Sequence, residues 1–152
     1  MRVMENQLIY EMKKILSKTL DYKMVLQDLA EKMDSPEIQG KLQEFAAIEK
    51  KESKTLIYII INLGGDLELI EQTGQQPLYW IAKPLPDPGD LPAVLDGLIG
   101  AERNKEQDYH KLLAHENLSE EHKNRLDVHR KQGEECLRYF QSTKISLENR
   151  SE

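Results

Sequence analysis

Hydrophobic residues recur along the chain at the spacing of one face of an α-helix, in four separate stretches. Over residues 5–33 the apolar side chains fall every three or four positions, which is the period of a helix that buries a single stripe. The same period recurs over residues 36–63, 90–114 and 119–142. Glycine, proline and aromatic residues are too sparse for a β-sandwich or a barrel. The pattern therefore predicts an all-α fold with four helices.

Residues suited to helix ends separate these stretches. Ser35 can cap the second helix, and Pro36 suits its first position, where the missing N–H costs nothing. A glycine pair at positions 64 and 65 can end that helix, since glycine readily adopts the left-handed conformation. Asp90 and Ser119 are good N-caps for the third and fourth helices.

The lengths of the connections predict how the helices are arranged. Only a few residues join the first helix to the second and the third to the fourth, so each pair forms an antiparallel hairpin. Residues 64–89 separate the second helix from the third. Fully extended, about 26 residues span roughly 85 Å, whereas the second helix is about 42 Å long. This segment can therefore return along the whole bundle as a crossover, which leaves the second and third helices parallel.

The crossover is rich in apolar residues, including Trp80, so we expect it to pack across the outside of two helices. Alternatively, Trp80 marks a surface for a partner protein. Residues 1–142 are predicted to form one domain, followed by a polar, frayed tail over residues 143–152.

Charge and composition narrow the range of functions. A net charge of −6, with acidic and basic residues interleaved, gives no support for nucleic-acid binding. The single cysteine, Cys136, cannot form an intrachain disulfide, and we expect it to be a small core residue. No apolar stretch approaches the roughly 20 residues of a membrane span, and no signal peptide is evident, so we expect a cytoplasmic protein. Motifs for nucleotide-binding loops and nucleophile elbows are absent as well.

Each helical stripe is interrupted near its middle by polar residues. The interruptions are Thr19 in the first helix, Glu49 and Glu52 in the second, Glu102 in the third and His129 in the fourth. Counted from the predicted helix ends, all five lie at a similar depth in the bundle. An unpaired, ionised glutamate is costly to bury, so such a residue shifts its pKa, pairs with a cation or coordinates a metal. Carboxylates and imidazole from several helices are the ligands of a di-iron or di-manganese centre.

Two stretches resemble a known family. The first, residues 29–53, reads LAEKMDSPEIQGKLQEFAAIEKKES and is similar to the first helical hairpin of rubrerythrin-type ferritin-like proteins. Those proteins carry Leu-Ala, an Asp-Pro-Glu turn and a Glu-x-x-His motif in the second helix. The second, residues 101–114, reads AERNKEQDYHKLLA and resembles their third helix, in which a ligand glutamate precedes a tyrosine by seven residues. The chain, whose second helix ends in LGGDLE, looks closest to a bacterial ferritin-like branch of unknown function, which implies a ferritin-like four-helix bundle.

Carried over by position, the family's ligand set is incomplete in this chain. Glu49 matches the first glutamate of the second-helix motif, but Glu52 occupies the position of its histidine. Glu102 matches the third-helix glutamate and His129 is the nearest counterpart on the fourth helix, while Thr19 stands where the first helix should supply a glutamate. The resemblance implies a site for iron, manganese or zinc formed by Glu49, Glu52, Glu102 and His129. By analogy, it also implies a homodimer.

The same residues allow a metal-free interpretation. Lys23, one turn from Thr19, can place an ammonium near Glu49 and neutralise it. In the purely structural case, the glutamates tilt to the rim of the stripe and pair with Lys23, Lys50 or Lys105.

Two functions therefore stay open. One is a stress-related or metal-related protein with a degenerate metal layer and without robust oxidase activity. The other is a non-catalytic helical interaction module or homo-oligomer with a structural polar layer, and in neither case do we expect an enzyme. For His129 alone we favour a hydrogen-bonded core histidine over a ligand, and for Tyr109 a core aromatic residue whose hydroxyl reaches a glutamate.

Overall fold

Four α-helices make up most of the part of this protein that the structure describes. The computed structural model describes residues 2–67, 87 and 89–150 of the 152-residue chain, and within these residues it contains no β-strand. The helices are α1 (Arg2–Lys32), α2 (Pro36–Asn62), α4 (Leu91–Leu113) and α5 (Glu120–Arg150). For these residues the prediction of an all-α, four-helix fold is confirmed. Most of the predicted crossover, including Trp80, lies outside the described residues.

The helix ends follow from the capping residues that the sequence supplies. The Ser35 hydroxyl accepts a hydrogen bond from the backbone N–H of Ile38, and the Asp90 side chain caps α4 in the same way. Gly64 has φ of 89° directly after α2, a conformation that glycine adopts at little cost. The Ser119 hydroxyl accepts a hydrogen bond from the backbone N–H of His122 at 3.2 Å and so caps the start of α5.

The last helix extends beyond its predicted end. We expected α5 to stop near residue 142 and a frayed tail to follow, but the helix continues to Arg150. Leu147 is partly buried against the core, and the Lys144 ammonium lies 2.6 Å from a carboxylate oxygen of Asp96 on α4. These contacts with α4 give the polar final turns a surface to pack on, which the sequence pattern alone does not reveal.

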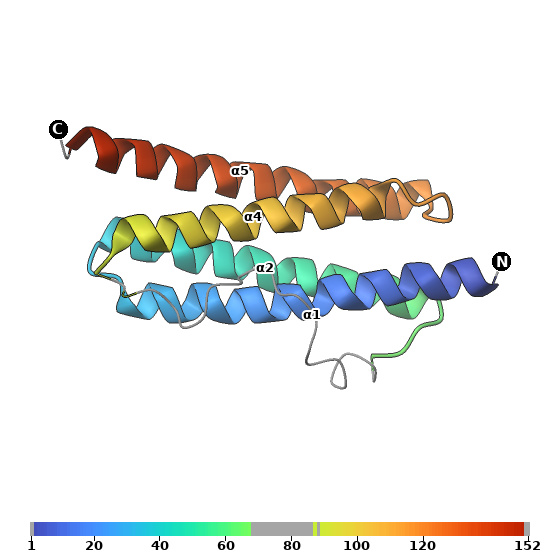
Figure 1. The fold of residues 1–152 in the computed structure, drawn as a ribbon. Helices are drawn as coiled ribbons and strands as arrows, with labels where there is room; N and C mark the ends of the chain where they lie inside the picture. The colour runs from blue at the N-terminus through green and yellow to red at the C-terminus, as the bar shows by residue number, and fades with distance from the viewer. Residues whose placement is uncertain (1, 68–86, 88, 151–152) are drawn as a thin grey trace.

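Cross-helix contacts define the relative directions of the helices. The Gln39 side chain donates to the Ala30 carbonyl near one end of α1 and α2, whereas Lys13 pairs with Asp66 near the other, so the two helices are antiparallel. Helices α4 and α5 form the second antiparallel pair (Figure 1).

The two hairpins also meet in a defined direction. Lys18 pairs with Asp108 and Tyr22 with Glu102, so α1 and α4 run in opposite directions. Helix α4 therefore runs in the same direction as α2, and both go from left to right in Figure 1.

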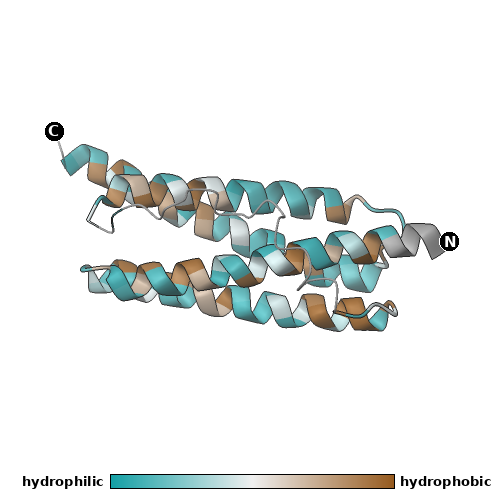
Figure 2. Ribbon diagram, turned by 60° about the horizontal axis from the view of Figure 1, so that its bottom comes forward, coloured by the Kyte–Doolittle hydropathy of each residue, from teal (hydrophilic) through white to brown (hydrophobic). Residues whose placement is uncertain are grey.

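Polar residues divide the core into two apolar clusters. Along every helix, hydrophobic and hydrophilic residues alternate (Figure 2), as expected where each helix buries one stripe. One cluster contains Tyr22, Leu42 and Phe140, and the other contains Leu8, Leu56 and Leu126. Between them lies a buried set of polar side chains, described below. None of the described helices has the length and apolar character needed to cross a membrane.

Candidate functional site

A layer of buried polar side chains crosses the bundle halfway along its length. Glu49, Glu52 and Glu102 are only 3%, 1% and 2% exposed, and Thr19 and His129 are buried as well. All five residues therefore face the interior, as their positions on the helical stripes predict. The metal-free interpretation placed the glutamates at the rim of the stripe. This is wrong, because all three are buried.

The centre of this layer is Lys105 of α4. Its ammonium lies 2.7 Å from Oε1 of Glu49, and 2.6 Å and 2.9 Å from Oε1 and Oε2 of Glu52. The Lys105 side chain is itself 3% exposed, so the three groups form a desolvated ion-pair network. Lys105 follows Glu102 by three residues and shares its helix face, which directs the lysine side chain inward.

The other two candidate partners do not fill this role. Lys50 is exposed and Lys23 is half-buried, and neither makes an ion pair with a layer glutamate in the described part of the chain. The prediction that Lys23 neutralises Glu49 is therefore wrong. Lys23 lies on the flank of α1, whereas Lys105 projects directly from the stripe of α4.

Helix α1 contributes a tyrosine in place of the expected ligand. The hydroxyl of Tyr22 donates to Oε2 of Glu102 at 2.7 Å, and both groups are buried. The Thr19 hydroxyl donates to the Ile15 carbonyl of its own helix at 2.8 Å. Tyr22 is one turn beyond Thr19 on the same stripe, so α1 reaches the layer through a phenol.

On the opposite side, Tyr109 and His129 form a hydrogen-bonded pair. The Tyr109 hydroxyl lies 2.9 Å from Nδ1 of His129, and the two rings pack edge to face. The prediction that the Tyr109 hydroxyl reaches a glutamate is therefore wrong, because it contacts His129. The prediction that His129 is a hydrogen-bonded core histidine is confirmed. Oε2 of Glu52 is more distant, at 3.9 Å from the same nitrogen.

Burial determines the protonation of this pair. Desolvation, with a contribution from the charge of Lys105, lowers the pKa of His129 to about 3, so the imidazole is neutral near pH 7. Burial also raises the pKa of Tyr109 well above its ordinary value, so the hydroxyl keeps its proton. No described group other than His129 accepts that proton. Tyr109 therefore donates to Nδ1, and Nε2 carries the imidazole hydrogen.

The carboxyl groups are held in an environment that disfavours their charge. Burial raises the pKa of Glu52 to about 8, although Lys105 opposes this shift, and raises the pKa of Glu102 to about 7. The pKa of Glu49 is raised for the same reason. Burial alone lowers the pKa of Lys105, but the surrounding carboxylates raise it well above its ordinary value. Three carboxyl groups thus share one firmly charged ammonium.

Two carboxylate oxygens in the layer lack a hydrogen-bond partner among the described residues. They are Oε2 of Glu49 and Oε1 of Glu102, and both are buried. Gly133 of α5 faces the second of these, since a Cβ placed there lies 3.6 Å from Oε1. The side of the layer around Glu102 is therefore less fully compensated than the side around Glu52.

These residues do not fit a di-metal centre. An ammonium lies between Glu49 and Glu52, where a bridging metal ion needs both carboxylates for itself. The Nδ1 atom of His129 is held by Tyr109, and Thr19 supplies no carboxylate. Within the described ranges, no group of three or more His, Cys, Asp or Glu side chains is arranged to hold a metal ion.

A pocket opens from the polar layer to the surface between α2 and α5. Its volume is about 230 Å³, and buried Glu52 and His129 contribute to its wall. The remaining lining residues come from the same two helices: Lys51, Thr55, Arg125, Val128 and Gln132.

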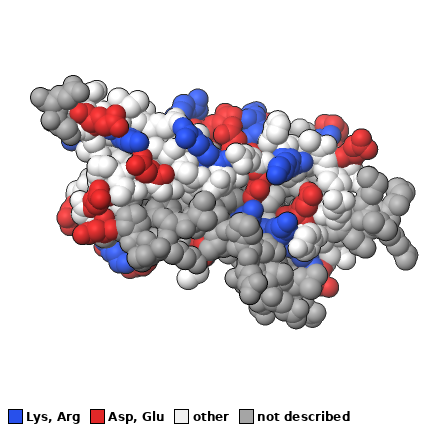
Figure 3. Space-filling model, viewed as in Figure 1, with Lys and Arg blue, Asp and Glu red and all other residues white. Residues whose placement is uncertain are grey.

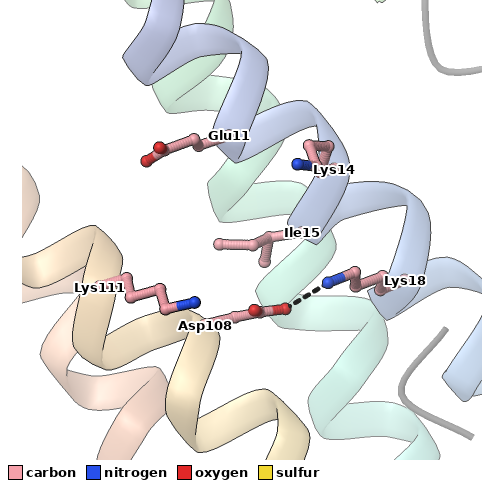
Figure 4. A pocket seen from close by; sticks show the side chains of 6 residues that line it. All are labelled: Glu11, Lys14, Ile15, Lys18, Asp108 and Lys111. Carbon is pink, nitrogen blue, oxygen red and sulfur yellow. Dashed lines mark hydrogen bonds and ion pairs between the residues drawn. The ribbon is translucent and has the colours of Figure 1, made fainter. Parts of the chain in front are cut away.

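A second pocket, between α1 and α4, is lined by groups of both signs (Figure 4). Lys18 pairs with Asp108 at 2.7 Å across it, and Glu11, Lys14 and Lys111 surround this pair. Charges of both signs are also intermixed over the face of the molecule in Figure 3. The Lys18–Asp108 pair closes the contact between the two helices, so we assign this pocket a structural role.

The sequence predicts the position of the layer and offers Lys105 as one of three possible cations, without selecting it. It gives no indication of the role of Tyr22. Both follow a recognised layer residue by three positions, Glu102 and Thr19 respectively. The helical period therefore contained the signal that places them on the same face.

Comparisons of the chain with models of protein families, with curated proteins and with solved structures find no match.

Proposed function

We propose that this chain is a ferritin-like bundle in which Lys105 supplies the positive charge that a metal supplies in such a layer, and that it acts as a non-catalytic helical module. The observation that carries the proposal is the contact of one buried ammonium with three oxygens of Glu49 and Glu52, at 2.6–2.9 Å. A fixed internal cation makes the fold independent of a bound metal.

The common direction of α2 and α4 supports the ferritin-like assignment, because a single crossover between the hairpins produces it (Figure 1). The motifs at residues 29–53 and 101–114 support it as well. A homodimer and a cytoplasmic location belong to the same proposal. Sedimentation velocity on the chain and on Trp80→Ala tests the assembly, and we expect a dimer that the substitution weakens.

Metal analysis tests the main proposal. Protein purified from cells grown with iron, manganese and zinc should carry less than about a tenth of an equivalent of metal per chain, because Lys105 competes for the same carboxylates. The thermal midpoint should not change when a chelator is added. A full equivalent of metal whose removal lowers the thermal midpoint would contradict the proposal.

The Lys105→Ala variant tests whether the ammonium is what excludes a metal from the layer. Removal of the ammonium leaves Glu49 and Glu52 without a cation, so added zinc or manganese should raise the thermal midpoint of this variant and not of the parent. Lys18→Ala is the matched control, since it removes an ammonium from the α1–α4 contact and leaves the layer intact. A metal response in the control equal to that of Lys105→Ala would contradict the specific role of Lys105.

A second candidate function is weak metal handling through one cation. The unpartnered oxygens of Glu49 and Glu102 favour it, because together they leave negative charge that Lys105 does not contact. This candidate predicts metal in the parent protein that is lost from Glu49→Gln and from Glu102→Gln. The first candidate predicts no difference in metal content between the parent and these variants.

A further inference from the structure

The pocket between α2 and α5 connects the buried layer with solvent. Its inner wall includes Glu52 and His129, which are 1% and 4% exposed. Its outer wall includes Lys51 and Arg125, one from each helix. A ligand in this pocket therefore meets two exposed cations and two groups of the layer.

The group that His129 presents to a ligand is a hydrogen-bond donor. Tyr109 donates to Nδ1, and the imidazole is neutral, so the hydrogen is on Nε2. Nε2 makes no hydrogen bond with a described residue. His129 therefore has a fixed tautomer with one donor unused.

The other polar groups of the pocket are also available donors. The Lys51 ammonium and the Gln132 amide have no hydrogen-bond or ion-pair partner in the described part of the chain. The Arg125 guanidinium makes only a long contact of 3.4 Å with Glu121 and lies over the Tyr58 ring. These groups leave donor capacity on both walls.

Among the described lining residues of the pocket, Glu52 is the one acidic group. Both oxygens of Glu52 accept from the Lys105 ammonium, at 2.6 Å and 2.9 Å, so this ammonium, which Glu49 shares, offsets part of the Glu52 charge. Lys51 and Arg125 then give the lining a positive surplus, in a protein whose net charge is −6. This pocket consequently differs in sign from the chain as a whole.

We propose that the α2–α5 pocket binds a small molecule with a carboxylate or phosphate group, whose oxygens accept hydrogen bonds from Nε2 of His129 and from Lys51 and Arg125. Such charge-assisted hydrogen bonds are the strong ones in anion recognition. Val128 offers an apolar surface for the rest of the ligand. The volume of about 230 Å³ is below the roughly 300–1,000 Å³ of pockets for drug-sized ligands, so the ligand is small. The proposal does not depend on whether Lys105 replaces a metal.

NMR of the ¹⁵N-histidine-labelled full chain tests the site directly. Without ligand, the His129 signals should show Nδ1 as an unprotonated acceptor and Nε2 as the protonated nitrogen. Inorganic phosphate and succinate, titrated separately at constant ionic strength, should shift the Nε2 signal of His129 in a saturable way. The signals of His110 and His115, which lie outside the pocket, should stay in place. The tighter of the two probes identifies the preferred anionic group.

Variants at the pocket mouth provide the quantitative test. Lys51→Gln combined with Arg125→Gln should weaken binding of the better probe about tenfold or more, because two charge-assisted contacts are lost. The matched control combines Lys54→Gln with Arg138→Gln, which changes the charge equally on the same two helices at exposed positions outside the pocket. The control should weaken binding less than about twofold, as expected for screened surface charges.

Three results overturn the proposal. The first is the absence of a saturable His129 shift with either probe. The second is an equal loss of affinity in the pocket variant and its control, which reveals general attraction of anions to cations. The third is unchanged affinity in His129→Gln, with the variant shown to be folded by its circular dichroism. Metal content plays no part in these readouts, so this proposal and the proposed function fail separately.

Discussion

The two sides of the polar layer solve the problem of a buried carboxylate differently. On the α2 side, both oxygens of Glu52 accept hydrogen bonds from a charged ammonium. On the α4 side, Glu102 accepts one hydrogen bond from the neutral hydroxyl of Tyr22, and its other oxygen has no partner among the described residues. Burial raises the pKa of both carboxyl groups, to about 8 for Glu52 and about 7 for Glu102, although the Lys105 ammonium opposes both shifts and the Tyr22 hydroxyl also opposes that of Glu102. The layer thus combines Glu52, whose two oxygens both contact a cation, with Glu102, which the described residues contact only through a neutral hydroxyl.

The largest effect should come from removal of the shared cation. Lys105→Met leaves Glu49 and Glu52 buried without a counter-charge, so the free energy of unfolding should fall by about 3–5 kcal/mol. Urea denaturation followed by circular dichroism measures this loss. The control Lys18→Met breaks an ion pair nearer the surface and should cost about 1 kcal/mol or less. Equal losses in the two variants would show that the layer is not specially dependent on its ammonium.

A smaller loss is expected on the α4 side. Tyr22→Phe removes the one hydrogen bond that Glu102 receives from the described residues, so the free energy of unfolding should fall by about 1–3 kcal/mol. The same change at exposed Tyr58 is the control and should have almost no effect. If Tyr22→Phe is as harmless as Tyr58→Phe, the Glu102 carboxyl does not need its donor.

The raised carboxyl pKa values predict an unusual pH dependence. Between pH 6.5 and pH 8 the unfolded chain has already released the protons of Glu52 and Glu102, while the folded protein still holds part of them. The folded state binds more protons, so stability should fall as pH rises, by about 1–2 kcal/mol over this window. His129 acts in the opposite direction, mainly below about pH 7, where the unfolded imidazole is protonated and its depressed pKa in the fold makes stability rise with pH.

Denaturation at several pH values measures this slope. Glu102→Gln should reduce it most between pH 6.5 and 7, because the pKa of Glu102 is about 7. The raised pKa values would be contradicted if the stability of the parent rose from pH 6.5 to 8. An identical pH dependence in Glu102→Gln would contradict them as well.

The smallest effect concerns the space beside Glu102. Gly133→Ala places a methyl group 3.6 Å from Oε1 of Glu102, an ordinary contact distance. Alanine should stabilise the helix by about 0.5–1 kcal/mol relative to glycine. Gly100→Ala on α4 is the control, since a Cβ there meets nothing within 4 Å. Thermal denaturation should show a smaller gain at Gly133 than at Gly100, because the methyl group at Gly133 must pack beside the buried, unpartnered Oε1 of Glu102.

The sequence predicted the position of the layer better than its bonding. Helical period and helix ends were sufficient to place Glu49, Glu102 and His129 at one depth, because a stripe fixes which face a residue occupies. They could not choose among Lys23, Lys50 and Lys105, since a lysine side chain is long enough to reach several neighbours. That choice depends on the distance between helices, which follows from packing and not from spacing along one helix.

The end of α5 shows the same limit. Residues 143–150 are polar enough to be predicted as a tail. In the structure, however, Lys144 forms an ion pair with Asp96, and Leu147 packs against the core. Both partners belong to other elements, so no local pattern reveals them. Capping residues, by contrast, act within a few positions of the chain, and the predicted starts at Ser35, Asp90 and Ser119 agree with the structure.

The division of the core into two apolar clusters has a consequence for alignment. Apolar stripes alone allow two helices to slide past one another by a turn, about 5.4 Å, with little change in buried area. Here such a slide moves the Lys105 ammonium away from its carboxylates and into the apolar residues on either side. The ion pairs of Lys105 therefore fix the register of α4 relative to α2 along the bundle axis.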